Sequence, residues 1–175
     1  MFLNNEGMKV NDITMAIGMG HLQKGHAISF ADFDNDGDQD VFQQMGGAKK
    51  VDKFRDALYA NPGFNNNWIK IRLEGVQSNR SAIGAKIKIT LDQGNQHIYR
   101  SINTGGSFGA NSLQQHIGIG SITIIDELEI FWPTSNTTQT FRNLRSNQSI
   151  QIREGEKSYK TTNEPLFSYD VYLEN

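Results

Sequence analysis

The chain has 175 residues, of which 37% are hydrophobic and 21% are charged, and its formal net charge is −2. This length suits one domain, or one domain with an appendage, and the composition allows a packed core. There is no basic cluster to favour a nucleic-acid partner, no apolar run near the ~20 residues of a membrane-spanning helix, and no cysteine for disulfide or thiol chemistry.

The first segment predicts a short hairpin followed by a glycine-rich connector. Two apolar patches, residues 2–3 and 8–13, flank Asn5-Glu6-Gly7, which is typical of a turn. The chain starts without the basic and then apolar layout of a signal peptide.

An acidic run follows, with the sequence Phe30-Ala-Asp-Phe-Asp-Asn-Asp-Gly-Asp-Gln-Asp-Val-Phe42. Five carboxylates so close in sequence repel one another unless a cation lies among them, and Ca²⁺ takes about six to eight hard oxygen ligands in flexible geometry. Gly37 permits the sharp bend that lets the chain wrap round an ion. The expected metal ligands are the side chains of Asp32, Asp34, Asp36 and Asp40 and the backbone carbonyl of Asp38. An acidic turn without a metal is the alternative.

The run matches an EF-hand only at its start. The position where an EF-hand needs a bidentate Glu holds Gln43. Residues 27–30 and 41–42, which flank the loop, are short, apolar and partly β-branched or aromatic, and so predict strands rather than helices.

The acidic run resembles the calcium-binding hairpin of FG-GAP/VCBS repeats, the blade units of integrin-α-type β-propellers. Repeats of this kind bury their apolar faces on neighbouring repeats, and this chain holds one complete Asp-rich loop. The resemblance implies a blade that is either the remnant of a longer propeller or a cap on the domain that follows.

Residues 48–60 predict a short amphipathic helix. Val51, Phe54 and Leu58 have helical spacing, and Asn61-Pro62-Gly63 would end the helix.

From residue 67 onward the pattern becomes the alternation of β-strands. Ile69, Ile71 and Leu73 face one way, and Trp68 and Lys70 face the other. Further strands are expected at 87–91, 96–102, 115–119, 127–132, 138–141 and 149–153. Short strands separated by turn residues predict a β-sandwich or barrel.

A second resemblance spans residues 67–155. It rests on Asn67-Trp-Ile-Lys-Ile-Arg-Leu-Glu-Gly75, Ser78-Asn-Arg-Ser-Ala-Ile-Gly-Ala85, Gly105-Gly-Ser-Phe-Gly109, His116-Ile-Gly-Ile-Gly120, Leu128-Glu-Ile-Phe-Trp-Pro133 and Arg153-Glu-Gly155. This series is similar to the ASPIC/UnbV domain, which commonly follows FG-GAP/VCBS repeats, as in cartilage acidic protein and many bacterial secreted proteins. The family often has Gly after Trp-Pro where this chain has Thr134, a departure that affects the local turn.

The expected fold class is all-β, with a propeller-blade-like calcium-binding hairpin remnant and a short helix packed on a β-sandwich or barrel. The expected organisation is an FG-GAP/VCBS-like repeat at 1–48, a short helix and linker at 49–66, an ASPIC/UnbV-like β domain at 67–155, and a tail or edge strand at 156–175. Alternating apolar residues between Phe167 and Leu173 favour a last strand there or the start of another domain.

The second half offers several candidate binding residues. Asn79 and Arg80 lie in a loop where they form a possible ligand surface, or where Asn79 sets a turn and Arg80 pins it. His116 is either a general base or a buried strand histidine. Trp68 and Trp132 are either a sugar-stacking platform or packing residues. The sequence contains no Gly-x-Ser-x-Gly elbow, phosphate loop, His-Glu-x-x-His motif or Cys nucleophile.

The expected function is a non-catalytic calcium-binding module for adhesion or ligand binding, in which Ca²⁺ is a structural staple. The expected partner is an extracellular protein or a glycan, without nucleic acid or a membrane span, and the chain is expected to be part of a longer repeat protein. A secreted, periplasmic or cell-surface location follows because weak calcium loops fill only where calcium is plentiful. The alternative is a carbohydrate-binding or carbohydrate-processing domain of a secreted enzyme, with its best residues at Arg80, His116, Glu127 and Glu129.

Overall fold

The computed structural model describes residues 1–5, 7, 9–22, 24–47, 50–51, 53–106 and 112–166. They fall into two compact units, the first made of Met1–Phe30 and Val41–Ala60, and the second of Ala31–Asp40 and the described residues after Ala60. In the described part of the chain, regular structure is all β-strand except for one 3-10 turn, η1 (Asp92–Gly94). The all-β prediction is confirmed.

The first unit contains two small sheets. β1 (Phe2–Asn5) and β2 (Lys9–Asp12) form the predicted antiparallel hairpin. β3 (Gly25–Ala31), β4 (Asp40–Met45) and β5 (Ala57–Tyr59) form a three-stranded sheet in the order β3-β4-β5. The segments that flank the acidic run are therefore strands, as predicted.

The predicted short helix within residues 48–60 is wrong for the residues described there, namely 50, 51 and 53–60. Three of these residues form β5, in which Tyr59 pairs with Val41 of β4. The apolar residues that suggested a helix share no buried face, because Val51 is 88% exposed and Leu58 is 44% exposed. A helix of about a dozen residues is marginal in water without such a face, whereas strand pairing satisfies the backbone of β5.

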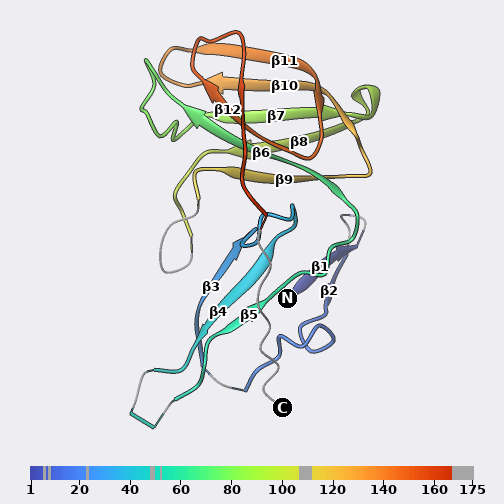
Figure 1. Ribbon diagram of the computed structural model, residues 1–175, viewed down its shortest axis with the longest axis vertical. Helices are drawn as coiled ribbons and strands as arrows, with labels where there is room; N and C mark the ends of the chain where they lie inside the picture. Colours follow the sequence, from blue (N-terminus) through green and yellow to red (C-terminus); the bar gives the residue numbers. More distant parts are fainter. Residues whose placement is uncertain are drawn as a thin grey trace. The chain divides into compact units, whose positions relative to one another are not determined.

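The second unit is a sandwich of two four-stranded sheets (Figure 1). One sheet has the order β11-β10-β7-β8 and the other has the order β13-β12-β6-β9. The strands are β6 (Asn67–Glu74), β7 (Lys86–Leu91), β8 (Gln96–Ser101), β9 (Gln115–Gly120), β10 (Ile124–Trp132), β11 (Thr137–Arg145), β12 (Gln148–Arg153) and β13 (Lys160–Thr162). Of the two predicted architectures, the described strands form the sandwich and not a closed barrel.

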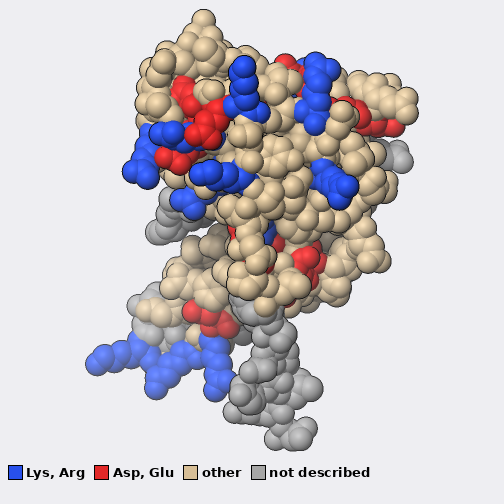
Figure 2. Space-filling view, turned by 45° about the horizontal axis from the view of Figure 1, so that its top comes forward, with Lys and Arg blue, Asp and Glu red and all other residues tan. Residues whose placement is uncertain are grey.

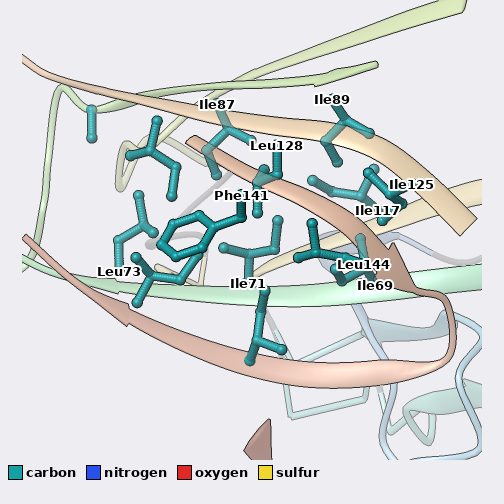
Figure 3. Packing of buried hydrophobic residues seen from close by; sticks show 14 of the residues in the cluster. Ile69, Ile71, Leu73, Ile87, Ile89, Ile117, Ile125, Leu128, Phe141 and Leu144 are labelled. Atoms are coloured by element: carbon teal, nitrogen blue, oxygen red, sulfur yellow. The ribbon is translucent and has the colours of Figure 1, made fainter. Parts of the chain in front are cut away.

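The core lies between these sheets, and Figure 3 shows side chains from both meeting there. Ile69 and Ile71 of β6 and Ile89 of β7 are fully buried, as the alternation predicted. β6 is an inner strand that pairs parallel with β12 and antiparallel with β9. Because every second residue of β6 enters the core, the residues between them point to the other face of its sheet.

β13 is an edge strand of the sandwich. β13 pairs antiparallel with β12, with Ser149 opposite Thr162. The strand predicted between Phe167 and Leu173 lies outside the described residues.

Within the described chain, no helix combines the length and the hydropathy needed to cross a membrane. On the face shown in Figure 2, basic and acidic side chains are interspersed.

Candidate metal centre

The Asp-rich loop, residues 31–40, joins β3 to β4 and belongs to the second unit. It contacts the outer face of the β13-β12-β6-β9 sheet, where Lys70 of β6 points away from the core. The strand register places His116 of β9 and Ser149 of β12 beside Lys70. These three polar side chains therefore form a row across three neighbouring strands, and the loop lies against this row.

Backbone N–H groups fold the loop by donating to its own carboxylates. The N–H of Gly37 donates to Oδ2 of Asp32 at 2.9 Å, and the N–H of Asp38 donates to Oδ1 of Asp36 at 3.0 Å. These turns bring carboxylate oxygens of Asp32, Asp34 and Asp36 within 4.8 Å of one another. Three of the predicted ligands are thus gathered at one point.

Several oxygens in the loop lack a donor. The Asp32 side chain is 2% exposed, and its Oδ1 is buried without a hydrogen-bond partner among the described residues. Both carboxylate oxygens of Asp38 are also buried without a hydrogen-bond partner among the described residues. A buried polar atom without a partner costs about 1–3 kcal/mol, and more when it is charged. The converging oxygens of Asp32, Asp34 and Asp36 are hard acceptors that fit a Ca²⁺ ion.

Asp40 closes the loop. Its Oδ2 accepts the N–H of Phe33 at 3.0 Å, and its Oδ1 accepts the N–H of Asn61 at 2.9 Å. The carboxylate is almost fully buried and fastens both the start of the loop and the segment that leads to β6. Its role as a metal ligand stays a prediction.

The loop carries an electrostatic cost at neutral pH. Burial, followed by the charges of the neighbouring carboxylates, raises the pKa of Asp38 to about 6. The same two causes raise the pKa of Asp34. Both shifts mean that ionising the loop opposes folding above the usual pKa of Asp, and a dication among the carboxylates would offset that opposition.

Lys70 is the buried cation that joins the loop to the sheet. Its Nζ lies 2.9 Å from Oδ2 of Asp32 and 2.7 Å from Oε2 of Glu164, and its side chain is 6% exposed. Glu164 also accepts hydrogen bonds from Gln114 and Ser149. Burial acts to lower the pKa of Lys70, but the hydrogen bonds to the two carboxylates outweigh it and raise the pKa.

His116 and Trp68 hold the bend of the loop. Nε2 of His116 lies 3.0 Å from the carbonyl oxygen of Gly37, and burial lowers the pKa of this histidine. Because a carbonyl oxygen only accepts hydrogen bonds, the ring donates its Nε2–H to Gly37. The Trp68 ring lies 5.6 Å from the His116 ring, centroid to centroid. His116 thus acts as a docking residue for the loop.

The Gly37→Ala substitution is expected to destabilise the second unit by about 1–3 kcal/mol. Gly37 has a φ of +101°, and a Cβ there would overlap the indole nitrogen of Trp68. Gly94→Ala is the matched control, since Gly94 has a φ of +90° with open space around its Cβ position. Urea unfolding of both variants measures the difference, and equal losses would show that the contact with Trp68 contributes nothing.

Most of the sandwich matches a known protein family. Residues 75–159, which run from the end of β6 through β12, match the family described as ASPIC and UnbV. This part of the chain is an ASPIC/UnbV domain. The match confirms the second of the two resemblances, whereas the FG-GAP/VCBS repeat stays a proposal. The comparison with curated proteins found no match.

Within the ASPIC/UnbV domain, Asn79 and Arg80 lie in a turn, and their role as a ligand surface stays a prediction. The Asn79 amide exchanges two hydrogen bonds with the backbone of Ile83, at 2.8 and 2.9 Å. The Arg80 side chain is 89% exposed and lies 3.9 Å from Glu74. Arg80 also borders a hollow of about 210 Å³. These contacts match the turn-setting alternative for Asn79.

The candidate catalytic side chains have separate partners. His116 contacts the Asp-rich loop, Arg80 contacts Glu74, and Glu127 and Glu129 pair with Arg142 and Lys88 on the other sheet. Trp132 is fully buried, so it forms no sugar-stacking platform with Trp68. The described residues give the enzyme alternative no shared cleft.

Glu154 is a structural residue that sequence reasoning missed. One carboxylate oxygen, Oε2, accepts the backbone N–H groups of Val76, Gln77 and Ser78 at 2.7–2.8 Å. The other, Oε1, accepts the hydroxyls of Ser78 at 2.9 Å and Ser135 at 2.6 Å. A buried carboxylate that accepts three consecutive backbone N–H groups leaves no periodic signal in the sequence. The only sequence signal for Glu154 is its place in Arg153-Glu-Gly155, one of the motifs that resemble the ASPIC/UnbV domain.

Proposed function

We propose that the chain is a non-catalytic calcium-binding module in which Ca²⁺ fixes the Asp-rich loop against the ASPIC/UnbV sandwich. The observation that carries this proposal is the convergence of Asp32, Asp34 and Asp36 at one point, where the buried Oδ1 of Asp32 has no partner among the described residues. A dication there would supply a partner for this oxygen and cancel the repulsion between the carboxylates.

The donor set favours calcium over other metals. Carboxylate and carbonyl oxygens suit Ca²⁺ and Mg²⁺, whereas zinc and copper prefer nitrogen and sulfur ligands. A flexible loop with many oxygens suits Ca²⁺ better than Mg²⁺, which demands near-ideal octahedral geometry and keeps several waters. Nε2 of His116 donates to a loop carbonyl and so orients the loop, while hard Ca²⁺ prefers oxygen ligands to the other ring nitrogen.

The wider role in this proposal is adhesion or ligand binding outside the cytoplasm. The resemblance of the acidic run to FG-GAP/VCBS repeats supports it, because such repeats accompany ASPIC/UnbV domains in secreted proteins. A weak calcium site is filled where calcium is plentiful, which supports a secreted, periplasmic or cell-surface location. The partner is an extracellular protein or a glycan.

Thermal unfolding in calcium and in chelator tests the site. Calcium is expected to stabilise the wild type by about 2.7 kcal/mol at a hundred times its dissociation constant. Asp34→Ala should lose this gain. In chelator the variant should be no less stable than the wild type, because it removes a carboxylate whose pKa is raised by burial and then by the charges of the neighbouring carboxylates.

Asp92→Ala provides the control, since Asp92 is an exposed aspartate outside the loop. It should keep the full calcium shift. A wild type that melts at the same temperature in calcium and in chelator would overturn the proposal, and so would an Asp34→Ala variant that responds like the wild type.

A further inference from the structure

A pocket of about 420 Å³ opens beside the Asp-rich loop on the outer face of the β13-β12-β6-β9 sheet. Its walls come from three parts of the second unit: the loop, the segment 61–67 and the strands β6 and β9. The volume lies within the range of about 300–1,000 Å³ that is usual for small-molecule sites. Asp36, Trp68 and His116, to which calcium binding and loop docking were assigned above, form part of its lining.

The Asp38 carboxylate lines this pocket, and its oxygens have no protein partner among the described residues. The expected calcium loop uses the backbone carbonyl of Asp38 and leaves its side chain unused. Both oxygens of that side chain are buried without a hydrogen-bond partner among the described residues, and Asp38 lines the pocket. Gly63 lets the chain pass close by, because a Cβ there would lie 3.2 Å from Oδ2 of Asp38. A ligand with hydroxyl donors would satisfy this carboxylate.

The rest of the lining is rich in amides and aromatic rings. Asn65 and Asn66 line the pocket, and both residues are exposed. Phe64 also lines it with a ring that is 72% exposed, and Trp68 forms a wall. Amides donate to and accept from hydroxyls, and aromatic rings pack on the apolar face of a sugar ring.

The charge of the pocket lining restricts the class of ligand that fits. Its ionisable lining comprises the carboxylates of Asp36 and Asp38 and the imidazole of His116, with no Lys or Arg among the described residues that line it. A sulfated or uronic sugar would meet like charges at close range, which is unfavourable in a partly buried site. A neutral saccharide meets no such repulsion.

We propose that this pocket binds a neutral saccharide, with Asp38 accepting its hydroxyls, the Asn65 and Asn66 amides bonding its oxygens, and Phe64 stacking on a ring. The inference rests on the proposed calcium function, because the ion would hold the loop that presents Asp38. It gives the module a ligand class and a site.

The test begins with an array of neutral, sialylated and sulfated oligosaccharides, probed in calcium and in chelator. Binding to neutral oligosaccharides is expected in calcium and should be lost in chelator. Calorimetric titration with the best-bound neutral oligosaccharide then compares variants. Asp38→Asn and Phe64→Ala should each weaken binding about tenfold or more.

Two control variants match these changes. Asp126→Asn alters another carboxylate with a buried oxygen that has no partner in the described chain, and Tyr99→Ala removes another exposed aromatic ring, 63% exposed. Both should bind as the wild type does. Asp38→Asn is also melted in calcium and in chelator, because a calcium shift that it retains would show that its side chain is not a metal ligand.

The outcomes separate the two proposals. A wild type with a calcium shift that binds no neutral oligosaccharide overturns the saccharide site and leaves the calcium site intact. Binding confined to sulfated oligosaccharides also overturns it. If Asp38→Asn loses the calcium shift, the Asp38 side chain is a metal ligand and the saccharide site is wrong. A wild type with no calcium shift contradicts the calcium proposal itself.

Discussion

The Glu154→Gln substitution is expected to destabilise the second unit by about 3 kcal/mol at neutral pH. Burial acts to raise the pKa of Glu154, but hydrogen bonds from Ser135, Ser78 and Val76 outweigh it and hold the pKa at about 2. The carboxylate now accepts the backbone N–H groups of residues 76–78 and the hydroxyls of Ser78 and Ser135. Glutamine would present an NH₂ group in place of one carboxylate oxygen, so some of these donors would lose their acceptor. The residue is 7% exposed, and water cannot replace these bonds.

The pH dependence of this effect has a definite sign. The folded pKa of about 2 lies below the ordinary value of 4.5, so the carboxylate contributes its stability above about pH 4.5. That contribution falls as the pH drops from 4.5 towards 2, where the folded protein also takes up the proton. The difference between wild type and Glu154→Gln should therefore shrink across this window.

Urea unfolding in chelator at several pH values measures this prediction without interference from calcium binding. Glu156→Gln is the control, since Glu156 is more exposed and pairs with Arg153 at 3.3 Å. A surface change of this kind should stay within about 0.5 kcal/mol. If the two variants lost the same stability, or if the loss by Glu154→Gln did not change with pH, the proposed anchoring by the Glu154 carboxylate would be wrong.

The Lys70→Met substitution is expected to cost about 3–5 kcal/mol in calcium-free protein. Methionine keeps the length of the side chain but removes the ammonium that lies between Asp32 and Glu164. Removing one partner of a buried ion pair leaves the other charge without compensation, and Asp32 is only 2% exposed.

Calcium should reduce the cost of this change. A dication among the loop carboxylates would compensate Asp32 from the side opposite Lys70, because Oδ1 of Asp32 is the oxygen without a protein partner. Lys70→Met should therefore show a larger calcium shift than the wild type. The fold of the variant is checked by the circular dichroism of the sandwich in both conditions.

Lys88→Met is the control for this experiment. Lys88 pairs with Glu129 on the other sheet, where the two side chains are 37% and 29% exposed. Pairs in such positions contribute at most about 1 kcal/mol. Similar losses for the two lysine variants in chelator would contradict the structural importance of Lys70, and an unchanged calcium shift in Lys70→Met would contradict its link to the metal site.

Local patterns determined most of the sandwich. Alternation along β6 and β7 predicted which residues enter the core, because side chains of a strand point alternately to its two faces. The sequence also predicted that the carboxylates of the acidic loop converge. They occupy alternate positions on both sides of Gly37, and they point inward once the backbone bends there. Trp68 and Lys70 were correctly placed opposite the core isoleucines.

Local pattern failed where tertiary pairing decided the outcome. The helical spacing within residues 48–60 predicted a helix, yet Ala57–Tyr59 pair with β4 as a strand. Backbone hydrogen bonding to a neighbouring strand depends on residues distant in sequence, so the periodicity of one short segment could not reveal it. The hydrogen bonds to Glu154 were also hidden from local pattern, because their donors come from residues 76–78 and 135, which are distant in sequence.

The sequence by itself therefore determined the strand class, the core face of the sandwich and the residues of the acidic loop. Only the tertiary structure decided where that loop lies. It groups with the sandwich, and the strand register aligns Lys70 with His116 and Ser149 on the face that receives it. The physical reason is that a row across three strands joins residues up to about 80 positions apart, and no local periodicity encodes such a row.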